Sequence, residues 1–201
     1  AMVNSASAEQ VRLNNMMPLA GKYNAELIAL TMTEQGIPGT ADGRAAVALD
    51  LINAAMEHGI PSDRLYLDPL VLPVSADQAG VKETIEAIRV FKQLVEPAPK
   101  TIVGLSNVSN GAPDHLRPIL NQTFLMMLMH CGVEGAIVDA FDKDLRDIAR
   151  GKRPELLDLV GKVMAGEPVD KDKLSKEELD YYKTVNVLLG KSLYSDSWLE
   201  L

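Results

Sequence analysis

The sequence predicts an α/β protein built around a parallel sheet. Three short apolar runs, each followed by polar residues and a helix-like stretch, support this prediction: 65–69, 101–107 and 136–139. Their starts are about 35 residues apart, which fits one strand, one helix and two loops. Residues that end parallel strands meet at the carboxyl edge of the sheet, where sites are built. We therefore expect Asp68, Asn107 and Asp139 to be neighbours.

Five strands are expected, beginning near residues 2, 27, 65, 101 and 135. Residues 27–32 (LIALTM) are apolar except for Thr31, and the first run ends in the polar Asn4 and Ser5. A closed (β/α)8 barrel of the TIM type needs eight strands. The pattern is therefore that of an open five-stranded sheet, or of about five C-terminal β/α units of a barrel that lacks its first strands.

Helical periodicity separates the strands and continues after the last one. The expected helices cover 9–23, 41–58, 77–94, 118–130, 144–150, 154–165 and 175–189. In the second helix, Ala45, Leu49, Ile52 and Met56 recur at helical spacing, which predicts a core-facing side. The Met-rich run 124–129 is predicted to be buried helix, because Met fills gaps in a core. The charged loop 166–173 lies within a C-terminal helical extension.

Composition narrows the classes of function. The chain has 201 residues and a formal net charge of −8, which argues against nucleic acid or an anionic membrane as a partner. The single cysteine, Cys131, excludes an intrachain disulfide and favours a cytoplasmic setting. No apolar run is long enough for a membrane span. His130 and Cys131 have no second ligand pair at metal spacing, so no metal site is predicted.

Polar residues at the strand ends are the candidate site, each with an ordinary structural alternative. A carboxylate such as Asp68 accepts two hydrogen bonds from an amino-substituted heterocycle, but it can also cap a loop. Asn4 and Asn107 can bind a substrate nitrogen or form turns. Arg117 can meet an anion near a helix start or form a surface salt bridge. The pair Asp139 and Asp142 is interpreted as solvated.

Five segments together resemble one family. They are VNSAS (3–7), LYLDPLVLPV (65–74), GLSNVSNG (104–111), RPILNQTFL (117–125) and AIVDAFD (136–142). These segments are similar to the pterin-binding methyltransferases, which include methyltetrahydrofolate:corrinoid/iron-sulfur protein methyltransferase. The resemblance runs from residue 2 to about 150 and resumes over 188–199.

This resemblance implies a (β/α)8 barrel whose cavity binds the pterin of tetrahydrofolate or methyltetrahydrofolate. It implies transfer of a methyl group between the pterin nitrogen and the cobalt of a corrinoid (cobalamin) carried by a partner protein. Asn107 corresponds to the residue whose amide contacts the methyl-bearing nitrogen. The residues that correspond to substrate-binding positions are Asn4, Asp68, Gly104, Ser106, Arg117 and Ile137.

The sequence also departs from the family. The first three strands of the family are absent, and two residues are inserted between Asn107 and Arg117. We expect one barrel domain over 1–201 with a helical extension at 143–201, completed by a second copy or by a companion N-terminal fragment. The alternatives are a truncated, non-catalytic pterin-binding fragment and a dihydropteroate synthase-like enzyme. The latter ranks lower because basic residues that it needs are replaced within 106–108 and 138–140.

Overall fold

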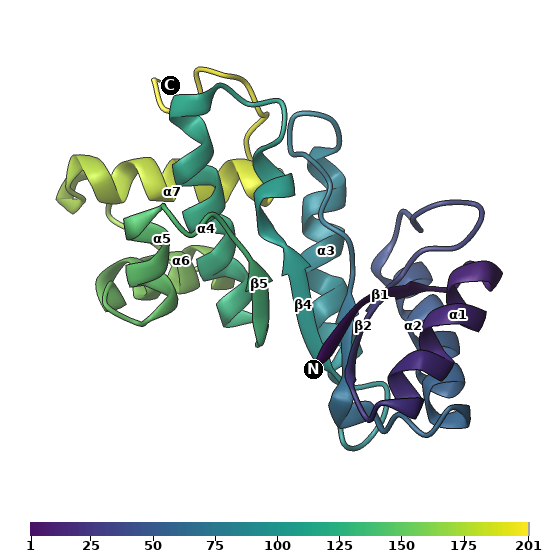
Figure 1. Cartoon of the computed structure of the whole chain (residues 1–201). Helices are drawn as coiled ribbons and strands as arrows, with labels where there is room; N and C mark the ends of the chain where they lie inside the picture. Colours follow the sequence, from purple (N-terminus) through teal and green to yellow (C-terminus); the bar gives the residue numbers. More distant parts are fainter. Residues whose placement is uncertain (201) are drawn as a thin grey trace. The chain divides into compact units, whose positions relative to one another are not determined.

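A computed structural model describes residues 1–200 and contains a five-stranded sheet with helices. The strands are β1 (Met2–Ser7), β2 (Glu26–Leu30), β3 (Leu65–Asp68), β4 (Lys100–Gly104) and β5 (Gly135–Ile137). They lie side by side in chain order (Figure 1). The pairs from β1 to β4 are parallel, with Leu27 opposite Leu65 and Ala29 opposite Leu67. The predicted α/β class with a parallel sheet is therefore confirmed.

Seven α-helices occupy the described residues close to their expected ranges. They are α1 (Gln10–Lys22), α2 (Ala41–Glu57), α3 (Gln78–Phe91), α4 (Arg117–His130), α5 (Lys143–Ala149), α6 (Pro154–Ala165) and α7 (Lys176–Leu188). Short 3-10 turns are η1 (Ser62–Arg64), η2 (Leu105–Ser109), η3 (Asp114–Leu116) and η4 (Lys171–Lys173). Ser175 and Glu178 form a capping box at the start of α7, which satisfies backbone N–H groups that a helix end leaves open.

The chain forms two compact units, which are described separately. The first comprises 1–70, 83–104 and 132–136, and the second comprises 71–82, 105–131 and 137–200. The first unit holds most of the sheet, together with α1 and α2. The second holds the segments that follow β4 and β5 and the whole C-terminal helical extension.

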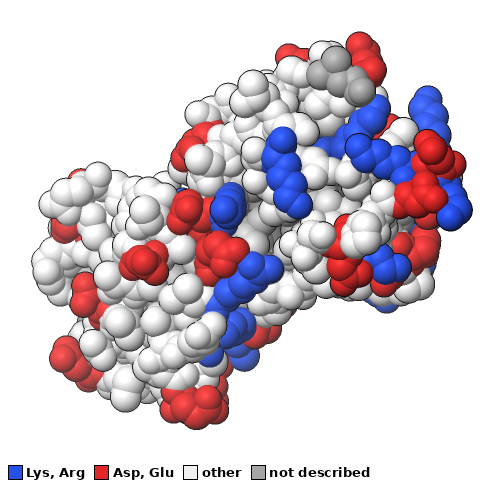
Figure 2. Space-filling view, turned by 180° about the vertical axis from the view of Figure 1, so that it is seen from behind, with Lys and Arg blue, Asp and Glu red and all other residues white. Residues whose placement is uncertain are grey.

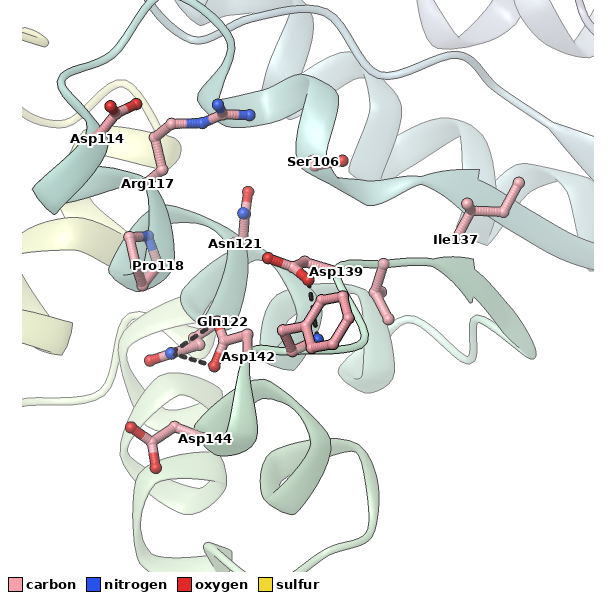
Figure 3. Close-up of a pocket in the computed structure, with 12 residues that line it drawn as sticks. Ser106, Asp114, Arg117, Pro118, Asn121, Gln122, Ile137, Asp139, Asp142 and Asp144 are labelled. Carbon is pink, nitrogen blue, oxygen red and sulfur yellow. Dashed lines mark hydrogen bonds between the residues drawn. The ribbon is translucent and has the colours of Figure 1, made fainter.

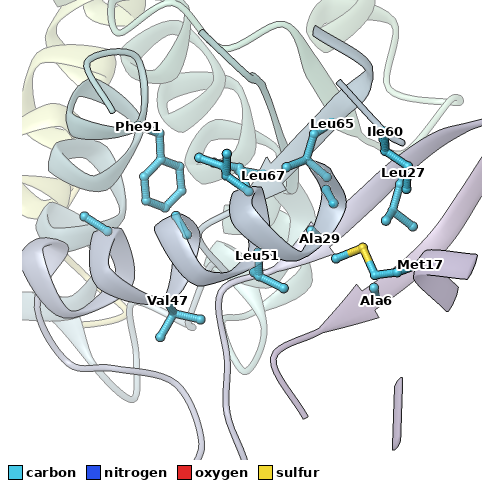
Figure 4. Packing of buried hydrophobic residues seen from close by; sticks show 14 of the residues in the cluster. Ala6, Met17, Leu27, Ala29, Val47, Leu51, Ile60, Leu65, Leu67 and Phe91 are labelled. Carbon is cyan, nitrogen blue, oxygen red and sulfur yellow. The ribbon is translucent and has the colours of Figure 1, made fainter. Parts of the chain in front are cut away.

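The core of the first unit lies between the sheet and its helices (Figure 4). Alternate strand residues such as Leu27, Ala29 and Leu67 are fully buried, as the two-residue period of a strand requires. Met17 of α1 and Phe91 of α3 belong to the same cluster. The buried apolar side chains of α2 are mostly small, which lets the helix pack closely; they are Ala41, Ala45, Val47, Ala48, Leu51, Ile52 and Ala55, and Arg44 of the same helix is also buried.

The predicted face of α2 was partly wrong. Leu49 is 38% exposed and Met56 is 60% exposed, whereas Ala48 and Ala55 are buried. The true buried side is rotated by about one residue from the predicted one. The prediction followed the large apolar side chains and therefore chose the wrong side of α2. The side that is buried carries several alanines, which allow the helix to pack closely.

In the second unit, α4 is the central helix. Its predicted apolar run is buried from Phe124 to Leu128, and α5, α6 and α7 pack against the helix. A Cβ at Gly161 of α6 would lie 2.6 Å from the His130 ring, so glycine at this position lets the ring pack against α6. Trp198 is 3% exposed and donates through Nε1 to Thr184 Oγ1 at 3.0 Å. The C-terminal extension is thus an integral part of this unit's core.

Candidate functional site

A pocket of about 690 Å³ lies in the second unit, where the segments after β4 and β5 meet the start of α4 (Figure 3). Its polar lining contains carboxylates, amides and one guanidinium. The lining residues are Ser106, Asp114, Arg117, Pro118, Asn121, Gln122, Ile137, Val138, Asp139, Phe141, Asp142 and Asp144. The volume is within the range of small-molecule sites. Carboxylate and amide oxygens can accept hydrogen bonds from an N–H-rich ligand.

Asn121 is the most informative residue of this pocket, and the sequence reasoning missed it. The residue is 7% exposed, and its Oδ1 atom has no hydrogen-bond partner within residues 1–200. Figure 3 shows its side chain directed from α4 towards the space beside Arg117 and Ser106. A buried acceptor without a partner is costly, so this atom is suited to a ligand N–H. The available signal was an Asn inside an otherwise apolar helical run.

Arg117 is held in place by its neighbours. Its Nε donates to Ser109 Oγ at 3.2 Å, and Nη2 donates to Asn110 Oδ1 at 3.3 Å. Both partners are uncharged, so the positive charge of the guanidinium is not neutralised by them. Arg117 can therefore meet an anionic or carbonyl group of a ligand, and the surface salt-bridge alternative does not describe its contacts.

Asp139 and Asp142 have structural partners. Asp142 accepts a hydrogen bond from Leu145 N as the N-cap of α5, and it accepts two from Gln122 Nε2 at 3.1 and 3.0 Å. Gln122 Oε1 in turn accepts from Tyr181 of α7 at 2.6 Å. Burial raises the pKa of Tyr181, so the phenol stays a donor. The interpretation of Asp142 as simply solvated was wrong, because this network ties it to α4 and α7.

Asp68 ends β3 in the first unit and is 7% exposed. One carboxylate oxygen accepts from Leu70 N at 2.8 Å. Burial raises the pKa of Asp68 from 3.8 to about 6 and outweighs the opposing effects of that hydrogen bond and of the Arg44 charge. With a pKa of about 6, the Asp68 carboxyl is mainly ionised at pH 7 and can then accept hydrogen bonds.

The raised pKa of Asp68 predicts a pH-dependent stability. The folded protein binds the proton more tightly than the unfolded chain, so the free energy of unfolding falls as pH rises from about 4 to about 6. The loss is on the order of 3 kcal/mol. Asp68→Asn should flatten this part of the pH profile and raise the stability at pH 7. Urea unfolding of both proteins across this range measures the effect, and an unchanged profile contradicts it.

The comparisons with known proteins give the family. Residues 1–139 match the model described as "Pterin binding enzyme", which is more than half of the chain. The chain belongs to the pterin-binding enzymes. The match covers β1 to β5 together with α1 to α4, whereas α5, α6 and α7 lie outside it. The pocket is lined by residues on both sides of this boundary.

Relatives of this chain include methylcorrinoid:tetrahydrofolate methyltransferase of Eubacterium limosum. It is 30% identical over 149 residues, covering 72% of this chain and 53% of the relative. Methionine synthases of Mycobacterium leprae (strain TN) and Mycobacterium tuberculosis (strain ATCC 25618 / H37Rv) are each 32% identical. These matches cover 79% of this chain and 14% of each synthase. The chain thus spans about half the length of the first relative and about a seventh of the others.

The pocket brings together three of the seven predicted site residues, Ser106, Arg117 and Ile137. Asn107 lies beside Ser106 on η2, is exposed, and accepts a hydrogen bond from Asn110 at 3.2 Å.

The other three predicted residues belong to the first unit. Asn4 is exposed on β1, Asp68 is buried, and Gly104 ends β4. That Asp68 and Asn107 act in one site stays a prediction.

Two further structural findings concern residues 1–200. No three His, Cys, Asp or Glu side chains come together there in an arrangement that could hold a metal ion. Every helix there is too short or too polar to cross a bilayer.

Proposed function

We propose that this chain binds the pterin of tetrahydrofolate or methyltetrahydrofolate. In this proposal, it takes part in methyl transfer between the pterin nitrogen and the cobalt of a corrinoid carried by a partner protein. Membership of the pterin-binding enzymes supports the first part. The names of the relatives, a methylcorrinoid:tetrahydrofolate methyltransferase and methionine synthases, support the second.

The observation that carries the proposal is the unpartnered Asn121 oxygen in the pocket. A pterin carries several N–H donors on a flat ring, and the pocket volume of about 690 Å³ is adequate for such a heterocycle. Most of the lining comes from GLSNVSNG, RPILNQTFL and AIVDAFD, three of the segments that resemble the family. The pocket therefore has the hydrogen-bonding chemistry that an amino-substituted heterocycle requires.

The proposed fold of the whole protein is a (β/α)8 barrel. The strand order β1 to β5, with parallel pairing from β1 to β4, supports five of its units, and residues 143–201 form the proposed helical extension of a single domain. A second copy, as in a homodimer, or a companion N-terminal fragment is proposed to complete the sheet. The proposed setting is cytoplasmic.

The proposed site residues bind the pterin and polarise its methyl-bearing nitrogen. Asn4 and Asp68 hydrogen bond to the pterin ring, while Gly104, Ser106, Arg117 and Ile137 line its pocket, as the family resemblance implies. Asn107 contacts the methyl-bearing nitrogen. A tertiary amine leaves poorly unless its nitrogen carries positive charge, and a neutral amide supports that charge without ionising. The corrinoid of the partner supplies the cobalt that exchanges the methyl group.

A binding experiment tests the first part of the proposal. We expect wild-type chain to bind methyltetrahydrofolate in a calorimetric titration and Asp68→Asn to bind at least about tenfold more weakly, because a charge-assisted hydrogen bond is lost. Asp63→Asn is the matched control, since Asp63 is an exposed carboxylate of the same unit. Equal affinities of Asp68→Asn and wild type contradict the assigned role of Asp68.

Adding a reduced corrinoid protein tests the second part. Transfer is followed by the change in corrinoid absorbance when methyltetrahydrofolate and the protein are both present. If the absorbance of the corrinoid changes and the pterin binds tightly, the proposed methyltransferase function is supported. Tight pterin binding without any change favours the alternative, a pterin-binding fragment that does not catalyse.

A further inference from the structure

A second concave site lies on α7 and the C-terminal segment, within the second unit. Its volume is about 580 Å³, and it shares no residue with the pocket described above. It combines apolar and aromatic walls with three lysines and no carboxylate. The lining residues are Lys171, Leu179, Tyr182, Lys183, Asn186, Val187, Lys191, Ser192, Leu193 and Trp198.

The floor of this site is built from fixed parts. Gly190, which has a φ of +69°, lies just after the C-terminal end of α7, where the chain turns away from the helix. Gln78 Nε2 donates to the carbonyl oxygens of Val187 and Ser192, each at 2.7 Å, and so holds this turn in place. Trp198 is buried and bonded to Thr184. A ligand would thus meet a largely preformed surface, which reduces the entropic cost of binding.

The three lysines are positioned without being neutralised. Lys183 Nζ donates to Leu199 O at 2.7 Å, and Lys191 Nζ donates to Val163 O at 3.2 Å. The ammonium of Lys171 lies 5.0 Å from the centre of the Tyr182 ring. Each ammonium has three N–H donors, so at least two on each of Lys183 and Lys191 remain for a ligand.

Three other lysines of the same unit differ in this respect. Lys152, Lys162 and Lys173 each pair with an aspartate at 2.5 to 2.8 Å. Within residues 1–200, no carboxylate lies within 4.0 Å of the three pocket lysines. Figure 2 shows several Lys and Arg side chains at the upper right of the view, some of them beside Asp and Glu side chains. In a chain of net charge −8, such a cationic pocket is a local exception.

We propose that this pocket binds a small organic polyanion, with two or more carboxylate or phosphate groups on an apolar stem. The negative groups pair with Lys171, Lys183 and Lys191. The stem lies against the apolar wall that includes Tyr182 and the 86% exposed Leu193. Charge-assisted hydrogen bonds from lysine fit either anion, so the two sources are distinguished by experiment.

The test is calorimetric titration of the chain with two polyanions. Trimesate presents carboxylates on a benzene ring, and hydroquinone bisphosphate presents phosphates on one. Trimesamide, the uncharged counterpart of trimesate, is the ligand control. We expect at least one polyanion to bind, with affinity that falls as salt rises. The polyanion that binds identifies the class of negative group. If neither binds, or if trimesamide binds as well as trimesate, the proposal is wrong.

Variants assign the binding to the pocket. Lys171→Gln and Lys183→Gln should each lower the affinity about tenfold, which corresponds to one lost charged hydrogen bond. Lys176→Gln is the matched control, since Lys176 is an exposed lysine of α7 outside the pocket. The side chain of Lys171 is exposed and donates to no backbone carbonyl within residues 1–200, so Lys171→Gln is expected to fold. This variant therefore keeps the test valid if Lys183→Gln unfolds. An equal loss in Lys176→Gln would overturn the assignment. Methyltetrahydrofolate binding, measured separately, is expected to be unaffected.

Discussion

Replacing Asn107 with alanine should slow methyl transfer by about 10²- to 10³-fold, as the loss of one oriented polar group in a transition state does. The affinity for methyltetrahydrofolate should change much less, because the amide acts mainly on the charge that develops at the methyl-bearing nitrogen. Asn107 is exposed on η2, and its one recorded side-chain bond is to Asn110. Its amide can therefore turn towards a ligand without breaking a buried network.

The measurement is single-turnover transfer to a corrinoid protein, together with a separate binding titration. Asn15→Ala is the control substitution, because Asn15 is an exposed asparagine of α1 that lies outside the proposed site. We expect a small effect on rate from this control. Equal losses of rate and affinity in Asn107→Ala would remove the special role of its amide.

The largest effect on stability is expected from Phe124→Ala. Phe124 is fully buried in α4, the helix that also carries Arg117, Asn121 and Gln122. Truncation removes apolar contacts and leaves a cavity, which costs about 3–5 kcal/mol. Because α4 holds one wall of the pocket, ligand binding should weaken along with stability.

Phe141→Ala is the matched control for this experiment. Phe141 is 94% exposed, so the same substitution should change the free energy of unfolding by no more than about 0.5 kcal/mol. Urea unfolding followed by circular dichroism measures both variants. A similar destabilisation of the two proteins would contradict the assigned burial.

The secondary structure could be predicted well from particular local signals. The apolar run before Asp68 and the run 101–104 became β3 and β4, since short apolar stretches bounded by turn residues favour buried strands. Helical periodicity over 175–189 predicted α7, which runs from Lys176 to Leu188 in the structure. The buried side of α2 was not predictable in the same way, because it depends on how closely the sheet approaches its alanines.

The candidate site was predictable only in part. Ser106, Arg117 and Ile137 follow from strand ends and family segments, and they line one pocket. Asn121 could not be found by the same reasoning, because an Asn in a helix is usually solvated or bonded to its neighbours. Its significance arises from burial without a partner, which is a property of packing.

The sequence by itself determined the α/β class, the strand and helix ranges, and the family segments that carry the proposed pterin chemistry. These depend on local periodicity, turn residues and short motifs, all of which a linear chain contains. Only the tertiary structure decided that Asp142 belongs to the Gln122–Tyr181 network, that Asp68 has a raised pKa, and that three lysines surround one cavity. Burial, electrostatic environment and hydrogen-bond partners depend on residues distant in sequence, so they exist only once the chain is folded.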